Sequence, residues 1–220
     1  MRILALDTSS KSCSAALYDS TLLGEITLDL GLTHSEKLMP MVDALFTLTG
    51  AEKSSVDAIA VAAGPGSFTG LRIGMATAQG LSLALGVPIA PVPTLYALKE
   101  GGAGKAKLTC PMMDARRGEV YAAVYRGDEA VLAPGPYPLK EVLRSIGDES
   151  VYVLGDGAYV HKEAILEALP NAVIAPKESG MLKAGYIAAA ALKQNLFVSD
   201  AQARIDYMRQ SQAERLRNGR

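Results

Sequence analysis

A glycine-rich segment constrains the fold more than any other part of the chain: Gly64-Pro65-Gly66-Ser67-Phe68-Thr69-Gly70-Leu71-Arg72-Ile73-Gly74. It follows a short apolar run, residues 57–63, which is typical of a buried strand. It leads into a proline-free stretch with a wide apolar face, residues 69–85, which predicts a helix. Glycine permits close backbone approach, and free N–H groups at a helix start attract anions. The turn therefore either contacts a ligand or lets another backbone come very close.

The segment does not match the common phosphate-binding loops. Its glycines follow G-x-G-x-x-x-G rather than G-x-G-x-x-G, and the G-K-[ST] of a P-loop is missing. Ser67 does not lie in the G-x-S-x-G context of a serine nucleophile. A purely structural alternative is a tight strand-to-helix turn capped by Ser67 or Thr69. The residues expected to form the turn are Gly64, Pro65, Gly66, Ser67, Phe68, Thr69, Gly70 and Arg72.

Composition narrows the class of protein. The 220 residues are 49% hydrophobic and 20% charged, which is typical of a soluble globular protein with one large domain or two small ones. A net charge of −1 disfavours a stand-alone nucleic-acid binder, so any such role is shared with a partner. Cys13 and Cys110 lack metal-site spacing and suit a reducing compartment.

Two features favour a cytoplasmic protein without a membrane segment. Asp7 interrupts the first apolar run too early for a secretory signal. The uncharged stretch 73–94 contains Gln79 and three prolines, which favours a buried helix followed by a strand over a membrane span.

The chain contains an internal repeat. Residues 3–18, ILALDTSSKSCSAALY, align with residues 110–125, CPMMDARRGEVYAAVY, so that Asp7 matches Asp114. Each copy is typical of a strand, a polar turn opening with Asp, and a second strand.

The first half continues with a strand at 22–30 and a helix opened by Thr33-x-x-Glu36, a capping box. Pro40 predicts a kink there or a later helix start. After the glycine turn and long helix come a strand near 87–92 and a short helix near 94–99. The order β-β-β-α-β-α-β-α is that of an actin-like, ribonuclease-H-like half.

The second half looks like an eroded copy. A link at 100–107 precedes the second hairpin, a helix at 139–146, a strand at 151–154, and helices near 159–169 and 181–193. We expect an α/β fold with two actin-like (ribonuclease-H-like) lobes, the second reduced. The expected boundaries are 1–100 and 101–220.

Several motifs, in order along the whole chain, carry a resemblance to a known family. They are Asp7-Thr8-Ser9-Ser10, His34-Ser35-Glu36, the glycine segment, Asp114 to Tyr121, Gly155-Asp156-Gly157-Ala158 and Tyr207-Met208-Arg209. With them the chain resembles the TsaB (YeaZ) family of the sugar kinase–Hsp70–actin superfamily. The glycine segment is the specific part; the short motifs alone are weak.

The resemblance implies a non-catalytic subunit that pairs with a longer paralogue, TsaD, and with an ATPase, TsaE. Together these proteins attach a threonylcarbamoyl group to the adenosine next to the anticodon of tRNAs reading ANN codons. It implies that ATP and metal are held by the partner subunits and that tRNA is met through the assembled complex. It also implies that the surface that pairs with TsaD can form a homodimer when TsaD is absent.

The chain's own residues give little support for catalysis. A TsaD-type metal site needs two histidines one helical turn apart, whereas only His34 and His161 are present and neither has such a partner. We therefore expect no catalytic and no metal-binding residue, and a metallopeptidase is the least favoured reading. We expect His34 in a first helical turn or an interface, and His161 on a solvated helix surface.

Nucleotide binding is the closer alternative, as in an ATP-dependent small-molecule kinase of the same superfamily. Kinases of this superfamily bind phosphate with an Asp-x-Gly turn in each half. The corresponding turns of this chain are Asp7-Thr8-Ser9 and Asp114-Ala115-Arg116, which lack the glycine that exposes backbone N–H groups to phosphate. Arg116 could compensate partly by charge. Gly155-Asp156-Gly157 is either a remnant of the adenosine site or a simple strand-to-helix turn. We expect a vestigial site at Asp7, Thr8, Ser9, Asp114, Arg116, Gly155, Asp156 and Gly157.

In the family, the two helices of the first half bundle with the matching pair of TsaD. This implies interface residues at Ser35, Leu38, Met39, Val42, Leu71, Gly74, Met75, Ala78 and Gln79, although the chain's own sheet could take up the same side chains. From Arg204 onward, five arginines oppose Asp206 and Glu214. This stretch is a solvated tail or a contact for tRNA phosphates or an acidic partner.

Overall fold

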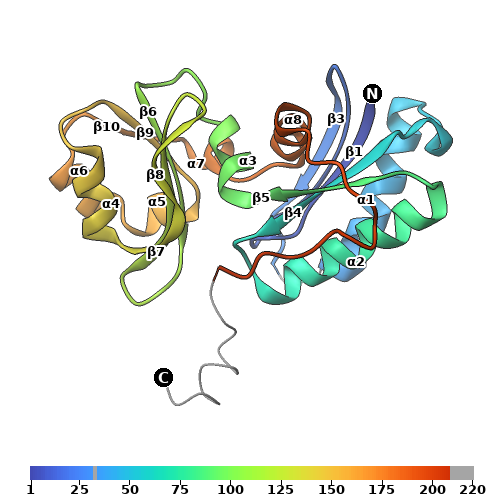
Figure 1. Cartoon of the computed structure of the whole chain (residues 1–220), viewed down its shortest axis with the longest axis horizontal. Helices are drawn as coiled ribbons and strands as arrows, with labels where there is room; N and C mark the ends of the chain where they lie inside the picture. Colours follow the sequence, from blue (N-terminus) through green and yellow to red (C-terminus); the bar gives the residue numbers. More distant parts are fainter. Residues whose placement is uncertain (32–33, 209–220) are drawn as a thin grey trace, which may run out of the picture. The chain divides into compact units, whose positions relative to one another are not determined.

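The computed structural model describes residues 1–31 and 34–208 and divides into two compact units (Figure 1). Among the described residues, unit 1 comprises 1–97 and 182–208, and unit 2 is Leu98–Met181. Each unit contains one five-stranded sheet covered by helices. The expected α/β class with two ribonuclease-H-like halves is confirmed.

The sheet of unit 1 has the strand order β3-β2-β1-β4-β5. Strand β1 pairs antiparallel with β2 and parallel with β4, so the N-terminal hairpin supplies one side of the sheet. The strands are β1 (Arg2–Asp7), β2 (Cys13–Asp19), β3 (Thr21–Leu28), β4 (Ala58–Gly64) and β5 (Ile89–Pro93). All seven residues of β4 are buried, which explains its continuous apolar sequence: helices cover both faces of a central strand.

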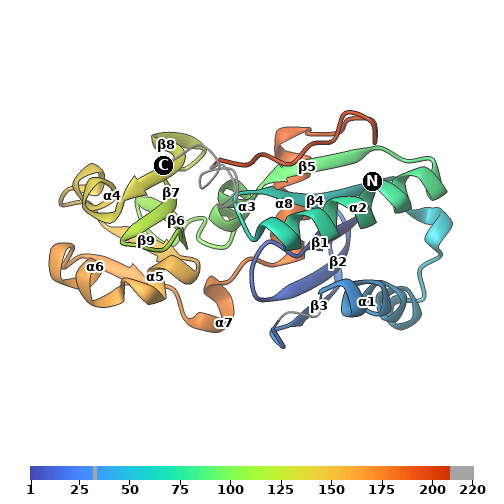
Figure 2. The ribbon, with the colours of Figure 1, turned by 90° about the horizontal axis from the view of Figure 1, so that it is seen from below.

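Helices α1 (His34–Thr49) and α2 (Phe68–Leu85) lie side by side on one face of this sheet. Figure 2 shows α2 along β4, and α1 beside β2 and β3. Leu4 and Leu6 of β1 pack in the core beneath them. The other face is covered by α8 (Ala184–Gln194), which contacts every strand of the sheet. Short elements complete the unit: η1 (Lys53–Ser55) and the start of α3 (Thr94–Glu100).

The position of α8 corrects the expected domain boundary, since the second half does not run to the C-terminus. Two side chains of the first sheet hold the start of this helix: Ser14 Oγ accepts the Ala184 N–H at 2.9 Å, and Glu25 Oε1 accepts the Gly185 N–H at 2.8 Å. A carboxylate at a helix N-terminus also interacts favourably with the helix dipole. The chain therefore returns to unit 1 through specific caps on β2 and β3.

Unit 2 repeats the topology of unit 1, with the strand order β10-β9-β6-β7-β8. Its first hairpin is antiparallel, and β6 pairs parallel with β9, as β1 does with β4. The strands are β6 (Leu108–Asp114), β7 (Glu119–Arg126), β8 (Glu129–Pro138), β9 (Val151–Leu154) and β10 (Ala172–Ile174). The helices are α4 (Leu139–Ile146), α5 (Asp156–Val160), α6 (Lys162–Ala168) and α7 (Lys177–Gly180). The repeat deduced from the two hairpins is therefore confirmed.

Two further expectations need correction. Helix α1 begins at His34 and runs through Pro40, so the later start is wrong; Pro40 is exposed, where water can satisfy the carbonyl left without a donor. Thr33, the expected cap, lies outside the described residues. The segment 100–107 is no free link, because a Cβ on Gly102 would lie 2.7 Å from Thr109 Cγ2, inside unit 2.

Within the described ranges, no helix combines the length and apolar character that crossing a membrane requires.

Candidate functional site

The glycine turn joins β4 to α2, as its flanking patterns predict. Ser67 is the N-cap of α2, and its Oγ accepts the Gly70 N–H at 3.3 Å. Gly64 has φ +119°, a backbone conformation that favours glycine, and its N–H donates to Thr94 Oγ1 at 3.1 Å. Of the two expected cap residues, Ser67 is thus the one confirmed.

The glycines of this turn allow the β1–β2 turn to lie directly against it. A Cβ on Gly66 would lie 2.6 Å from the Ser9 carbonyl oxygen, and one on Gly70 would overlap the Thr8 carbonyl oxygen. Hydrogen bonds hold the contact: the Ser67 N–H donates to Ser9 O, and Thr8 Oγ1 donates to Gly70 O, both at 2.7 Å. The alternative of close backbone approach is confirmed.

Asp7 ends β1 beneath this contact and is fully buried. Its Oδ1 accepts the Ser9 N–H at 2.9 Å, while Oδ2 makes no hydrogen bond to a described residue. Burial raises the pKa of the Asp7 carboxyl, and the hydrogen bond from the Ser9 N–H opposes that rise. Thr8 and Ser9 are only 1% exposed, so this part of the turn presents little of itself to solvent.

The raised pKa of Asp7 predicts that the difference in stability between the native chain and an Asp7→Asn variant depends on pH. As pH rises above about 4, the unfolded chain loses this proton before the folded chain does, so the Asp7 contribution to stability falls until the folded carboxyl also ionises. We expect Asp7→Asn to gain stability relative to the native chain between pH 4 and pH 7, measured by urea unfolding. The exposed Asp148→Asn is the control for loss of one carboxylate. A difference for Asp7→Asn that is equal at both pH values would contradict the prediction.

Unit 2 contains the corresponding turn at the end of β6. Asp114 Oδ1 accepts the Arg116 N–H at 2.9 Å, just as Asp7 does with Ser9. Asp156, the first residue of α5, accepts the Asp114 N–H at 3.2 Å through Oδ1, and burial raises its pKa. A Cβ on Gly157 would lie 2.9 Å from the Met113 carbonyl carbon. Asp114, Arg116, Asp156 and Gly157 therefore lie together, and Gly155-Asp156-Gly157 is a close-packed strand-to-helix turn.

Both histidines take part in packing. His34 begins α1, is 6% exposed, and its Nε2 lies 2.9 Å from Ser10 O, which fastens the helix start to the β1–β2 turn. The expectation of a solvated His161 is wrong: its side chain is 16% exposed, and its Nε2 lies 3.7 Å from Asp114 Oδ1. Among residues 1–31 and 34–208, no group of three or more His, Cys, Asp or Glu side chains could hold a metal ion.

Most of the expected interface residues face the core of unit 1 instead. Gly74 lies against Thr8 and Val61, so a larger side chain there would disturb the fold rather than a partner. The same correction applies to five apolar residues taken up by the chain's own core: Leu38, Val42, Leu71, Met75 and Ala78. Ser35 and Met39 are exposed on α1. Gln79 is half-buried and its Nε2 donates to Asp200 O at 3.3 Å.

A different surface remains open on the same two helices. On α2, the exposed positions include Ala76, Gly80 and Ala84, spaced four residues apart along one ridge, with Leu83 beside them at 76% exposure. On α1, Met39 is 39% exposed. Small residues along a ridge let another helix approach closely.

The C-terminal segment contributes contacts that sequence reasoning missed. The Asp206 N–H donates to Ala63 O at 2.7 Å, and Asp206 O lies against Gly64. Tyr207 contacts Arg72 and Phe68 at the start of α2. Part of the stretch from Arg204 is therefore packed on unit 1 rather than solvated. The only signal in the sequence was the motif Tyr207-Met208-Arg209.

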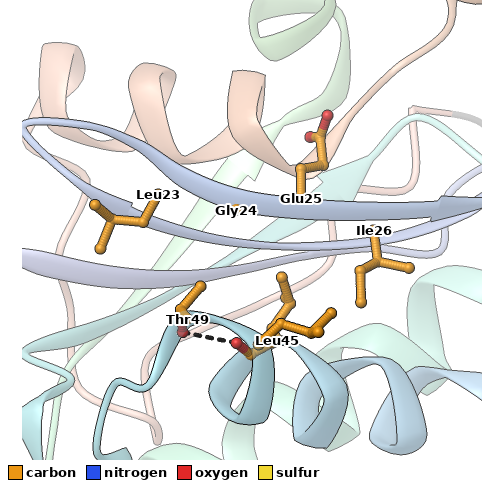
Figure 3. A pocket seen from close by; sticks show the side chains of 7 residues that line it. Leu23, Gly24, Glu25, Ile26, Leu45 and Thr49 are labelled. Carbon is orange, nitrogen blue, oxygen red and sulfur yellow. Dashed lines mark hydrogen bonds between the residues drawn. The ribbon is translucent and has the colours of Figure 1, made fainter.

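A surface groove of about 320 Å³ lies between β3 and the end of α1 (Figure 3). Leu23, Ile26 and Leu45 line it, and Glu25 points away toward the opposite face of the sheet. Thr49 Oγ1 donates to Leu45 O at 2.6 Å. Its lining residues include none of the Asp7 turn or of the glycine turn.

Comparison with known sequences gives a consistent result. The family model described as "TsaD: tRNA N6-adenosine threonylcarbamoyltransferase" matches residues 31–214. The chain is 42% identical over 132 residues to the "tRNA threonylcarbamoyladenosine biosynthesis protein TsaB" of Escherichia coli (strain K12), covering 59% of this chain and 57% of that protein. It is 35% identical over 176 residues to the Bacillus subtilis (strain 168) protein of the same name, covering 77% of each. The matches thus span about half to three quarters of these relatives.

Solved structures show the same fold. "YeaZ from Pseudomonas aeruginosa" superposes with a TM-score of 0.76 at 30% identity, covering 94% of this chain and 99% of that one. The ethanolamine utilization protein EutJ of Carboxydothermus hydrogenoformans, at 14% identity and a TM-score of 0.50, shares the fold alone. With its glycine turn, repeated sheet topology and these matches, the chain belongs to the TsaB (YeaZ) family of the actin-like superfamily.

Proposed function

We propose that this chain is a non-catalytic subunit that binds and organises a TsaD-type transferase, together with a TsaE-type ATPase. The complex would transfer a threonylcarbamoyl group to the adenosine adjacent to the anticodon in tRNAs reading ANN codons. The names of the relatives, "tRNA threonylcarbamoyladenosine biosynthesis protein TsaB", support a role in this modification.

The observation that carries the docking role is the exposed ridge of α2. Once the chain's own sheet has taken up Leu71, Gly74, Met75 and Ala78, the outward side still presents Ala76, Gly80 and Leu83. Leu83 is 76% exposed, an arrangement that a packed partner helix would stabilise. On this proposal the TsaD-type paralogue packs a matching pair of helices against this ridge.

The two Asp turns support a subunit without nucleotide chemistry of its own. In each turn the carboxylate of Asp7 or Asp114 already accepts the N–H two residues later, a group that a phosphate would need. The Thr8 and Ser9 carbonyls also lie against the glycine turn. On this proposal ATP and the metal ion bind in the partner subunits, and tRNA is met by the assembled complex.

The test is to mix the purified full chain with its TsaD-type paralogue and to follow the complex on a sizing column. We expect a stable heterodimer and, without the paralogue, self-association through the same helices. If no complex forms with or without nucleotide, the proposal fails. Calorimetry with Mg-ATP on the chain alone addresses the kinase alternative, which micromolar binding would favour.

A further inference from the structure

A cation and two aromatic rings form an exposed cluster at the N-terminal end of α2. The cluster, Phe68, Arg72 and Tyr207, is called here the Arg72 cluster. The Arg72 Cζ lies 3.8 Å from the centre of the Phe68 ring, and Arg72 Nε donates to the Tyr207 hydroxyl at 3.0 Å. The two ring centres lie 5.1 Å apart with their planes inclined by 36°.

The cluster leaves much of its apolar surface in water. Phe68 is 38% exposed and Tyr207 is 41% exposed, although both rings contact Arg72, which is itself exposed. Two adjacent rings, with the planar guanidinium lying over the Phe68 ring, offer flat surfaces and one positive charge. Unpaired bases of RNA stack on aromatic side chains and on guanidinium planes, and the charge suits the neighbouring phosphate.

The distribution of charge in the sequence favours the same partner. From Arg204 to the C-terminus there are five arginines and only two acidic residues, although the whole chain has a net charge of −1. Positive charge is thus concentrated in the stretch that contains Tyr207. A polyanion complements this positive charge. An RNA strand can in addition stack its bases on the flat rings, whereas a carboxylate group of an acidic partner cannot.

We propose that the Arg72 cluster binds an unpaired nucleotide of an RNA strand, with the base stacked on the cluster and Arg72 facing a phosphate. The inference rests on the proposed function, in which the RNA is a tRNA, and it assigns this chain a direct contact with that substrate. Stacking on the rings involves no hydrogen bonds to the base edges. The contact therefore discriminates unpaired from paired RNA rather than one base from another.

The test measures the binding of a fluorescein-labelled tRNA transcript to the complex of the full chain with its paralogue, by fluorescence anisotropy at fixed salt. Arg72→Lys keeps the positive charge but removes the planar guanidinium, and Tyr207→Ala removes one aromatic ring. We expect each to weaken binding about tenfold. Tyr207→Phe keeps the ring and should bind nearly as the native chain does. Arg144→Lys, on the exposed surface of α4, is the matched control and should change nothing. A fully paired RNA duplex should bind equally to all variants.

Native affinity for the transcript in both Arg72→Lys and Tyr207→Ala would overturn the inference. So would loss of the complex with the paralogue in these variants on a sizing column, since the cluster would then be a protein contact. If the native chain forms no complex at all, the proposed function fails and the same titration is run on the chain alone. There, transcript binding that Tyr207→Ala weakens still supports the inference, and absence of binding overturns it.

Discussion

Replacing Gly70 by alanine is expected to lower the free energy of unfolding of unit 1 by about 3 kcal/mol. The new Cβ would overlap the carbonyl oxygen of Thr8, a backbone atom that cannot rotate away. Relief requires separating α2 from the β1–β2 turn, which breaks the hydrogen bonds Ser67 N–H to Ser9 O and Thr8 Oγ1 to Gly70 O. Urea unfolding followed by far-ultraviolet circular dichroism measures the change.

Gly80 in the same helix provides the matched control. It is exposed, and among the described residues no atom outside the backbone of its own helix lies within 4 Å of an added Cβ, so Gly80→Ala should stabilise the protein by about 1 kcal/mol through helix propensity. The two substitutions add the same methyl group to the same helix and differ only in what that group meets. Equal stability of the two variants would show that the glycine turn is not a close-packed joint.

The expected repeat of the hairpins was sufficient to predict the β1–β2 and β6–β7 pairs, because the Asp turn and the alternating strands are local features. The short edge strand β10 was not predicted. The strand β8 was missed, since Pro134, Pro136 and Pro138 are typical of a loop, and an edge strand tolerates them. The position of α8 was missed for a different reason. Its Ala-rich sequence predicts a buried helix but not which sheet buries it, and its caps Ser14 and Glu25 are distant in sequence.

The glycine turn illustrates what local chemistry can settle. Its glycines predicted either a ligand contact or close backbone approach, and the segment that approaches it, Thr8-Ser9, could be found only in the folded chain. Of the residues on α2 expected at an interface, most face the chain's own core, which is the alternative that the sequence left open. Leu71, Met75 and Ala78 recur at helical spacing, the pattern of a core-facing stripe, and they occupy the core. The opposite side of the same helix carries the outward ridge, which includes Ala76 and Gly80.

That ridge leads to the prediction with the largest expected effect on binding. Ala76→Arg should weaken the complex with the TsaD-type paralogue about a hundredfold, because a long charged side chain would hold the facing helix away from α2. The substitution should leave the thermal unfolding midpoint almost unchanged, since Ala76 is exposed and arginine is nearly as good a helix former as alanine. Isothermal titration calorimetry of the purified chains measures the affinity.

Ala164→Arg is the matched control, because Ala164 is also an exposed alanine within a helix, α6 of unit 2. It adds the same charge and the same side chain at a site outside the ridge and should bind the paralogue with native affinity. Equal affinities for the two variants would mean that the partner does not dock on α2. Weaker binding for Ala76→Arg alone would separate the outward ridge from the inward residues Gly74 and Ala78, whose replacement acts on folding instead.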